Sequence, residues 1–586
     1  MQGGAGNDTY DVADVGDKVT ELANGGTDTI NSFGVDITMT LAKWGGGNVE
    51  NLTIQGALAN SVIGTAGNNV FTVDHTGDLT LDAGAGNDLM EFRNFGVNSL
   101  DGNDVIDGEG GNDVLEATID GLNTGLQVEG IETFRFETTG AASTLDVGWT
   151  VDDDVTQRID LSGNADITLD NLDSGIQIGL SGIALSASQN VTLGWEDDTD
   201  DTDVQEFLLG DVGDEDNDTW MNLAISDVRT LKFTLTEQGG ESLLDVAGVF
   251  GASHLQFTTG GGDLGTDLFL RELDGSQTVD FQDALLAANL EMDGVADALI
   301  VKLDNAVVLL EEVDSNLTTL TLDTTGSGGS SMVYLDGVDA ATSLVLKGNQ
   351  SVRLFDVRQD LNAEDLSNTS RILATDAVND LLFTGGSGRD QYFGGSGGDT
   401  LDGRLGDDLL VGNDGDDLLI GAVGHDDLRG GADNDTLVGD GNLQVGNDRL
   451  SGGSGNDNLT GGAGNDLFFF EHSGAGNADS ITDYDNDTAG GVSAGGDMIG
   501  LALSAFSFGG AFGFVTPGAS AALNPDFFVE GGDAADADDY LVWDSANGDL
   551  YYDADGSGAG AKALITSITF ADAGDNLTAG DIMVLG

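Results

Sequence analysis

The chain has 586 residues, and its 104 acidic and 18 basic side chains leave a formal net charge of −86. So negative a surface repels phosphates, which argues against nucleic acid and anionic membranes as direct partners, and no apolar run approaches the roughly 18 residues that insertion into a membrane needs. Because the chain has no cysteine, disulfides, thiolate metal sites and a cysteine nucleophile are also excluded.

The excess of carboxylates has to be neutralised if the chain is to fold. Hydrophobic residues make up 39% of the chain, too many for simple disorder, whereas repulsion among carboxylates opposes compaction. Ligand sets that are rich in oxygen and free of sulfur favour hard cations, and calcium first among them. Composition also allows the acidic surface of a halophilic protein, and the arrangement of the Asp residues distinguishes the two interpretations.

Residues 1–116 contain degenerate copies of a nine-residue unit with a Gly-rich first half and an Asp near its middle. The copies are GGAGNDTYD at 3–11, AGAGNDLME at 83–91, GNDVID at 102–107 and GEGGNDVLE at 108–116. Their Asp positions are Asp8, Asp88, Asp104 and Asp113, and the inward apolar residues Tyr10 and Met90 follow two positions later. The unit GTAGNNVFT at 64–72 carries Asn69 instead, which weakens the case for an ion there.

Residues 117–383 have a different sequence pattern. Short segments in which apolar and polar residues alternate replace the Gly-Asn-Asp turns. The segments are IETFRF at 131–136, VRTLKFTL at 228–235, HLQF at 254–257, LTTLTL at 317–322 and TSLVLKG at 342–348. Alternation predicts strands with one buried face, with inward pairs Phe134/Phe136, Leu231/Phe233, Leu255/Phe257, Leu320/Leu322 and Leu344/Leu346. We expect rungs of an irregular parallel β-solenoid, with a β-sandwich as the alternative, and one helix over DFQDALLAANLEM at 280–292.

Residues 384–470 carry the most regular repeat in the chain. From Gly385 the units read GGSGRDQYF, GGSGGDTLD, GRLGDDLLV, GNDGDDLLI, GAVGHDDLR and GGADNDTLV, then a longer unit from Gly439 to Ser451, then GGSGNDNLT and GGAGNDLFF. The Asp of each unit is followed two residues later by one large apolar side chain, namely Tyr392, Leu401, Leu410, Leu419, Leu428, Leu437, Leu450, Leu459 and Phe468. One apolar residue per unit cannot form a core alone, so the units must stack, and stacked carboxylates require cations between them.

These nonapeptides resemble the RTX β-roll repeats of proteins exported by type I secretion. The resemblance implies that two nonapeptides make one turn of a parallel β-roll, with several calcium ions (Ca²⁺) between neighbouring turns, held by the sixth-position Asp and by carbonyl oxygens of the Gly-rich turn. Carried over residue by residue, the implied metal ligands are Asp8, Asp88, Asp104, Asp113, Asp390, Asp399, Asp408, Asp417, Asp426, Asp435, Asp448, Asp457 and Asp466. The units depart from the pattern at Asp433, Arg404, Asn413 and Ala422, which replace Gly, and we expect weaker individual sites there and an intact stack.

Residues 471–586 resemble the end of an RTX protein. NADSITDYD at 477–485 and GDMIGLALSAF at 496–506 are similar to the segment that closes a β-roll, and residues 539–570 are similar to the terminal flanking module. The final LTAGDIMVLG resembles an uncleaved type I secretion signal, while the first residues lack the pattern of a Sec signal peptide. We therefore expect a secreted protein that contacts the type I secretion apparatus during export. For Asp553 and Asp555, in DADGSG, an acidic hairpin turn is favoured over another calcium site.

The sequence thus predicts an all-β chain, a parallel β-roll or β-solenoid with RTX calcium-binding repeats at both ends of a β-rich central region. The expected divisions are a degenerate N-terminal RTX β-roll with a spacer at 1–116, a β-rich, solenoid-like body at 117–383, the nonapeptide β-roll at 384–470 and a C-terminal capping module with the type I secretion signal at 471–586. The central body also resembles, more loosely, the β-rich bodies of calcium-dependent surface-layer proteins.

No catalytic constellation stands out in the sequence. The four histidines lie too far apart for HExxH, and GxSxG at 394–398 is explained by the repeat, which offers no strand–turn–helix context for a nucleophile. His425 occupies a variable repeat position, which indicates a solvated side chain. Carboxylate pairs of the glycosidase kind are expected by chance among 104 acids. We therefore expect a protein that is not an enzyme.

Three function classes are compatible with these features. The favoured one is a structural protein of the bacterial cell surface, a surface-layer, matrix or filament subunit that folds and self-assembles on binding calcium. The others are a calcium-dependent adhesin for cell-surface glycans and the repeat portion of an exported hydrolase. A repeat begins at Gly3, so the first rung is expected to be an open edge that joins copies head to tail; the alternatives are a fragment, or a segment after Asp11 that folds back over this rung.

Overall fold

The computed structural model describes most of the chain. The described residues are all except 57–59, 94–99, 101–102, 120–122, 126, 147–157, 173–175, 184–188, 196–203, 210–220, 227–229, 236–241, 251–253, 260–262, 272–276, 283–284, 293–296, 305, 314–316, 327–329, 336–337, 339–341, 376, 441–445, 475, 487–495, 509–519, 557–560 and 573–574. They form two compact units: the first comprises Met1–Leu299 and Glu312–Asn316, and the second comprises Ile300–Glu311 and Leu317–Gly586. Strands β27 (Asp297–Asp304) and β28 (Val307–Val313) include the divisions between them.

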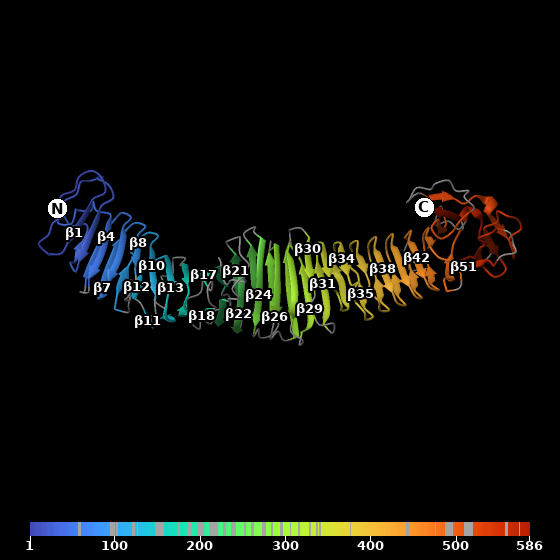
Figure 1. Ribbon diagram of the computed structural model, residues 1–586, viewed down its shortest axis with the longest axis horizontal. Helices are drawn as coiled ribbons and strands as arrows, with labels where there is room; N and C mark the ends of the chain where they lie inside the picture. Colours follow the sequence, from blue (N-terminus) through green and yellow to red (C-terminus); the bar gives the residue numbers. More distant parts are fainter. Residues whose placement is uncertain are drawn as a thin grey trace. The chain divides into compact units, whose positions relative to one another are not determined.

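The first unit is a β-solenoid whose strands pair in parallel with strands one turn away (Figure 1). One sheet consists of β1 (Thr9–Val12), β2 (Thr29–Phe33), β4 (Asn51–Gly56), β6 (Val70–His75), β8 (Leu89–Phe92), β10 (Val114–Ile119), β13 (Thr133–Thr138), β15 (Arg158–Gly163), β17 (Gln177–Ile183), β19 (Val204–Leu209), β21 (Thr230–Leu235), β23 (His254–Thr259) and β25 (Gln277–Gln282). A second face is built first from β3 (Ile37–Thr38), β5 (Asn60–Thr65), β7 (Leu79–Gly84), β9 (Val105–Asp107) and β12 (Gln127–Glu129). Farther along the chain a third ladder follows, with β11 (Asn123–Gly125), β14 (Ser143–Asp146), β16 (Ile167–Leu172), β18 (Gln189–Trp195), β20 (Met221–Ser226), β22 (Ser242–Phe250), β24 (Asp263–Arg271) and β26 (Leu285–Met292).

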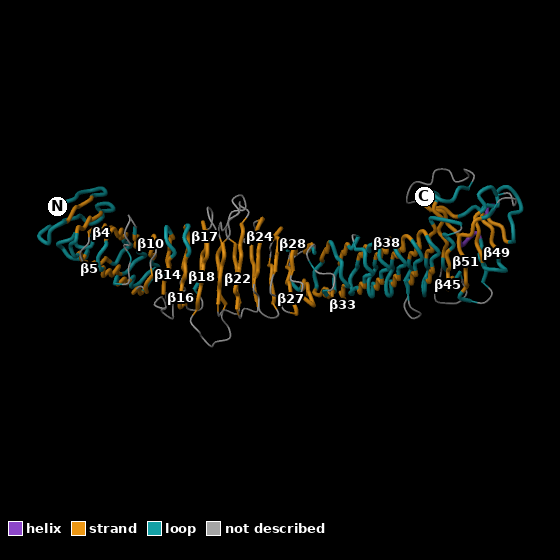
Figure 2. The backbone as a smooth tube through the Cα atoms, turned by 60° about the horizontal axis from the view of Figure 1, so that its bottom comes forward, coloured by secondary structure: helices purple, strands orange, loops and turns teal. Residues whose placement is uncertain are grey.

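The second unit is also wound as a β-solenoid, with two parallel ladders. The first ladder consists of β29 (Leu317–Thr324), β31 (Ser343–Gly348), β33 (Leu361–Leu366), β35 (Leu382–Thr384), β37 (Thr400–Asp402), β39 (Leu418–Ile420), β41 (Thr436–Val438), β43 (Asn458–Thr460) and β45 (Asp479–Tyr484). The second consists of β30 (Ser331–Tyr334), β32 (Val352–Phe355), β34 (Ser370–Leu373), β36 (Gln391–Phe393), β38 (Leu409–Asp414), β40 (Asp427–Ala432), β42 (Arg449–Ser454), β44 (Leu467–Phe470) and β46 (Met498–Ala502). In Figure 2 the short strands of this unit alternate with loops along the winding.

The C-terminal residues add a small β module to the end of both ladders. Strand β51 (Ala563–Phe570) pairs in parallel with β45, and β52 (Ile582–Leu585) pairs in parallel with β46. The remaining elements are β47 (Ser520–Ala522), β48 (Phe528–Glu530), β49 (Leu541–Asp544), β50 (Asp549–Tyr552) and the 3₁₀ turns η2 (Pro525–Phe527) and η3 (Ala579–Asp581). Because β47 is antiparallel to β52, and β50 is antiparallel to β49 and β51, this module departs from the all-parallel pairing of the solenoid.

The core of each unit consists of inward side chains that stack from turn to turn. In the second unit Leu401, Leu419, Leu437 and Leu459 occupy matching positions on successive strands and are buried. Tyr392, Leu410, Leu428, Leu450 and Phe468 form the matching column on the other ladder. The predicted inward residues of the nonapeptides are therefore confirmed, as is the prediction of a parallel solenoid over a β-sandwich.

The central region follows the predicted alternation where its side chains are described. Phe134/Phe136, Leu320/Leu322 and Leu344/Leu346 are buried. Leu231 pairs with Leu255 and Phe233 with Phe257 along the backbone, but these side chains lie outside the described part. The expected boundaries at 116/117 and 383/384 fall inside strands β10 and β35, so the winding is continuous across both.

The helix expected over residues 280–292 is wrong, because that segment forms the end of β25 and all of β26. β25 pairs in parallel with β23, and β26 pairs in parallel with β24. Helix-favouring residues such as Ala and Leu give only a weak local preference. In this segment the hydrogen bonds to the neighbouring parallel strands β23 and β24 outweigh that preference.

Four residues that replace glycine in the repeats have a strained backbone conformation. Arg404, Asn413, Ala422 and Asp433 have φ values of 71°, 80°, 74° and 78°. A side chain in this left-handed region costs about 1–2 kcal/mol. These residues occupy turn positions that elsewhere in the repeats hold Gly.

Replacing Ala422 with Gly is expected to stabilise the calcium-loaded protein by about 1 kcal/mol, because the relief of strain exceeds the added entropy of the unfolded chain. Ala432→Gly, at the end of β40, is the matched control and should lower stability by about 0.5–1 kcal/mol. Thermal unfolding of both variants in calcium measures the difference. An unfolding temperature for Ala422→Gly at or below that of the wild type would contradict the strain argument.

Candidate metal sites

The sixth-position Asp residues of the second unit, together with Asp479 and Asp497 after the last repeats, form two ladders, one along each side of the winding. On one side the backbone N–H of each Asp donates to the Oδ1 atom of the Asp one turn farther on, through Asp390, Asp408, Asp426, Asp448, Asp466 and Asp497. On the other side the same bonds join Asp399, Asp417, Asp435, Asp457 and Asp479. The N–O distances run from 2.6 Å, between Asp399 and Asp417, to 3.0 Å, between Asp457 and Asp479.

The ladder geometry agrees with two nonapeptides per turn. Most linked Asp residues are 18 positions apart, as in the bond from Asp408 to Asp426. The separation rises to 22 between Asp426 and Asp448, where the longer unit adds four residues, and the hydrogen bond is kept. The insertion therefore leaves the register of the carboxylates intact.

The second oxygen of most of these carboxylates has no hydrogen-bond partner. The Oδ2 atoms concerned are buried and belong to Asp408, Asp417, Asp426, Asp435, Asp448, Asp457 and Asp466. At Asp390 and Asp399, by contrast, Oδ2 accepts an N–H from Gly386 and Gly395. Burying a charged oxygen without a partner costs several kcal/mol, and a bound cation offsets this cost. The row of orphaned oxygens is thus the kind of ligand that a stack of hard cations requires.

Glycine at the first position of each unit makes room beside these oxygens. A Cβ atom on Gly412 would lie 2.0 Å from Asp417 Oδ2 and 2.8 Å from the carbonyl oxygen of Gly430 in the next turn. A Cβ on Gly430 would lie 2.1 Å from Asp435 Oδ2 and 2.5 Å from the carbonyl oxygen of Gly452. The space beside each of these glycines, called a seat below, therefore brings a carboxylate oxygen and a backbone carbonyl oxygen together. Such all-oxygen donor sets suit calcium.

Burial and mutual repulsion make these carboxyl groups hard to ionise without a cation. Burial raises the pKa of Asp408 to about 8, and the charges of Asp390 and Asp426 add to the rise. Burial likewise raises the pKa of Asp435 and of Asp448 to about 8. A divalent cation between the turns reverses this effect because it favours the charged form.

In the described part of the first unit a comparable ladder includes glutamates and an asparagine among its members. The N–H of Asp8 donates to Asp28 Oδ1 at 2.8 Å, and the N–H of Asp28 donates to Glu50 Oε2 at 2.8 Å. Farther along, the order is Asn69, Asp88, Asp113 and Glu132, each donating its N–H to the side chain of the next. Asp104 lies on the other face of the unit and accepts the N–H of Leu79. Asp88 and Asp113 are buried with orphaned Oδ2 atoms, whereas Asp8 is only half-buried.

The structure also adds ladder members that the nonapeptide motif did not identify. They are Asp28, Glu50, Glu132, Asp479 and Asp497. Each stands two residues before a buried apolar side chain, namely Ile30, Leu52, Phe134, Ile481 and Ile499. The sequence signal that identifies them is an acidic residue two positions before an apolar residue, a spacing that the repeats share. The glycines of the nonapeptide are not needed for it.

Asp440, in the longer unit, is a further missed candidate. Its side chain is buried, and neither carboxylate oxygen has a hydrogen-bond partner. A Cβ atom on Gly446 would lie 2.6 Å from Asp440 Oδ2 and 2.7 Å from Asp448 Oδ1. Asp440 therefore places a second carboxylate close to that of Asp448.

The family comparison agrees with this geometry. The model of the RTX calcium-binding nonapeptide repeat matches residues 97–119, 384–419, 411–442 and 445–471. These segments of the chain are RTX calcium-binding nonapeptide repeats. The repeats bind calcium, and their number implies several ions. Proteins with such repeats are typically secreted.

The search of curated proteins found no match to this chain. Among the described residues, no helix is long and apolar enough to cross a bilayer.

Other sequence candidates have structural explanations. His425 is exposed, and its Nδ1 accepts the N–H of Asn447. Asp553 Oδ1 accepts the N–H groups of Asp555 and Gly556, the pattern of a turn. Asn69 donates from its side chain to the carbonyl of Glu50 and accepts the N–H of Thr65, so it closes the ladder without a free carboxylate.

The raised pKa values predict opposite effects of pH with and without calcium. Burial raises the pKa of Asp408 to about 8, of Asp417 to about 7 and of Asp426 to about 6 in the calcium-free fold, whereas an Asp in the unfolded chain has a pKa of about 3.9. The folded form therefore binds more protons across this window, and its stability falls as pH rises from about 4 to about 8. Calcium needs the deprotonated form, so its affinity rises over the same window and its binding releases protons.

We expect more β-structure in chelator at about pH 5 than at about pH 8, and proton release on calcium binding near neutral pH. Circular dichroism measures the first effect, and calorimetry in buffers of different ionisation enthalpy measures the second. A heat of binding that is the same in all buffers would contradict the prediction.

Gly412→Ala is expected to weaken calcium binding by about tenfold at its seat, because the added methyl group displaces the carboxylate of Asp417 and crowds the Gly430 carbonyl. Gly532→Ala is the control, since a Cβ there would meet nothing within 4 Å. Calcium titration followed by circular dichroism compares the two variants. Equal midpoints would show that the space beside Gly412 is not part of a calcium seat.

Proposed function

We propose that this protein is a secreted structural component of the bacterial cell surface, a surface-layer, matrix or filament subunit that folds and self-associates when calcium binds. The observation that carries the proposal is the carboxylate ladder, which recurs in both units and extends into the C-terminal module. The same stacking that builds the fold thus repeats buried carboxylates, as candidate ion ligands, in both units.

Charge explains why calcium would control association as well as folding. The chain carries a net charge of −86, so two copies repel each other strongly at low ionic strength. Ions held along the ladders reduce this charge, and ions shared between exposed carboxylates would reduce it further. Association is therefore favoured only where calcium reaches millimolar levels, as it does outside cells.

Export fits the same dependence on calcium. A chain kept unfolded by its own carboxylates inside the cell can pass through a type I secretion channel and fold after it leaves. The proposed function therefore joins export, folding and assembly to a single chemical signal.

The test is assembly of the purified protein in calcium and in chelator, followed by light scattering and electron microscopy. Ordered sheets or filaments are expected with calcium and monomers with chelator. The double variant Asp408→Asn, Asp426→Asn should assemble less, whereas Asp74→Asn, an exposed position in β6, should behave as the wild type. A folded protein that stays monomeric at millimolar calcium would argue against the proposal.

A further inference from the structure

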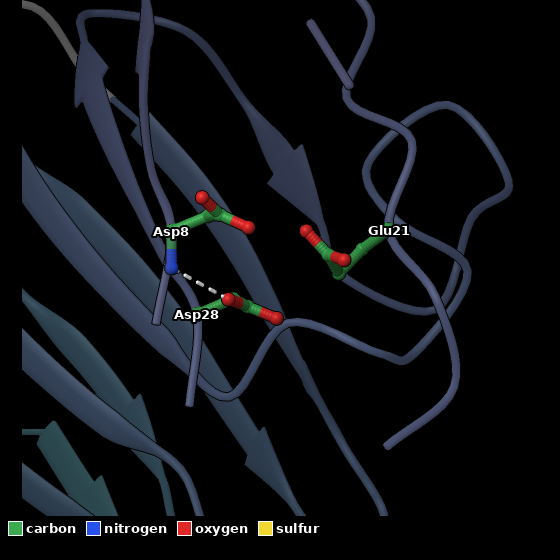
Figure 3. Close-up of side chains that lie close together, drawn as sticks. All are labelled: Asp8, Glu21 and Asp28. Atoms are coloured by element: carbon green, nitrogen blue, oxygen red, sulfur yellow. Dashed lines mark hydrogen bonds between the residues drawn. The ribbon is translucent and has the colours of Figure 1, made fainter. Parts of the chain in front are cut away.

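Three carboxylates from different segments converge in the first turns of the chain. Asp8 precedes β1, Asp28 precedes β2, and Glu21 lies in the segment between these strands. One oxygen atom from each can be chosen so that all three lie within 4.8 Å of one another. Figure 3 shows the three side chains pointing toward a common space.

Asp28 gives this cluster a feature that hydrogen bonding inside it does not explain. Its side chain is completely buried, and its Oδ1 accepts the N–H of Asp8 at 2.8 Å. Its Oδ2 has no hydrogen-bond partner. A buried carboxylate oxygen that faces two other carboxylates without a donor needs a cation.

Two neutral hydrogen-bond donors hold Glu21 in place, so the negative charge of the cluster is not compensated. Glu21 Oε1 accepts the N–H of Leu22 at 2.7 Å, and Glu21 Oε2 accepts the hydroxyl of Tyr10. Tyr10 is therefore a positioning residue for the Glu21 carboxylate.

Backbone oxygens lie beside the same space. A Cβ atom on Gly25 would be 2.8 Å from the carbonyl oxygen of Gly4, 3.0 Å from that of Leu22 and 3.0 Å from Glu21 Oε1. Glycine is needed here because any side chain would enter this group of oxygens. Carboxylates supplemented by carbonyl oxygens are the donor set that calcium prefers.

We propose that Asp8, Glu21 and Asp28 form a calcium site that is distinct in composition from the repeat sites, because its third carboxylate comes from outside the Gly-rich turns. The three carboxylates exceed the charge of one divalent ion, which favours calcium over a monovalent cation. The ion would tie the segment that carries Glu21 to the first two rungs. That segment already touches the winding through the bridges Gln2–Thr20 and Val19–Trp44.

This inference goes beyond the proposed function, since it requires neither secretion nor assembly. The experiment is hydrogen–deuterium exchange of the full chain during a calcium titration, with peptides resolved by mass spectrometry. In the wild type, peptides from residues 1–33 should gain protection as calcium rises. In Glu21→Gln and in Asp28→Asn the midpoint for these peptides should move to higher calcium by about tenfold or more, while that for residues 399–435 stays unchanged.

Asp74→Asn is the matched control, because it removes one carboxylate from an exposed position of the same unit. Midpoints for residues 1–33 that are equal in Glu21→Gln and Asp74→Asn would overturn the proposal, and so would protection that does not depend on calcium. A variant that is unprotected at every calcium concentration supports the site if the chelated wild-type peptide exchanges equally fast. It contradicts the site if the chelated wild type stays protected, because the side chain then supports the fold without an ion.

Discussion

Removal of calcium with a chelator at neutral pH is expected to unfold residues 385–469, with loss of most of their β-structure. In the folded form each turn brings buried carboxylates together, and eight of the described Asp residues in this segment, Asp440 included, have an oxygen without a hydrogen-bond partner. The inward core supplies only one large apolar residue per nonapeptide, which is too little to offset this electrostatic cost. Binding free energy from calcium therefore becomes folding free energy.

Circular dichroism in chelator and in millimolar calcium measures this effect. Magnesium in place of calcium is the control, because it demands octahedral geometry and keeps its own waters, so it should restore little structure. Unchanged β-content in chelator would show that the ladders fold without ions.

The double variant Asp408→Asn, Asp426→Asn is expected to raise the calcium concentration needed for folding by about a hundredfold, roughly tenfold for each altered seat. Asp408 and Asp426 are one turn apart on the same ladder and are joined by a hydrogen bond of 2.7 Å. Asn keeps an acceptor for that bond, so the change removes charge and a cation ligand while it retains shape. The cooperativity of binding should also fall, because two adjoining seats are lost.

Asp433→Asn is the control for this variant, since Asp433 is exposed and lies outside the sixth-position register. Its calcium midpoint should stay close to that of the wild type. Calorimetric titration of both proteins gives the comparison. Equal losses in the two variants would contradict the assignment of the ladders.

The regular part of the fold follows directly from the sequence, because glycine and apolar spacing act locally. The sixth-position Asp residues and their inward partners, such as Asp417 and Leu419, lie where the nonapeptide predicts. Glu50 and Glu132 take up equivalent ladder positions without a Gly-rich turn, so a motif defined by glycine passes over them. Glu21 is less accessible still to sequence reasoning, because only folding brings it beside Asp8 and Asp28.

The most direct test of the account is a crystal structure of the calcium-loaded protein with anomalous scattering data collected to locate the ions. We predict a row of calcium ions on each side of the second unit, each in contact with the Oδ2 atom of a ladder Asp such as Asp408 or Asp417. Ions located only on exposed carboxylates, with these buried oxygens still unpartnered, would contradict it.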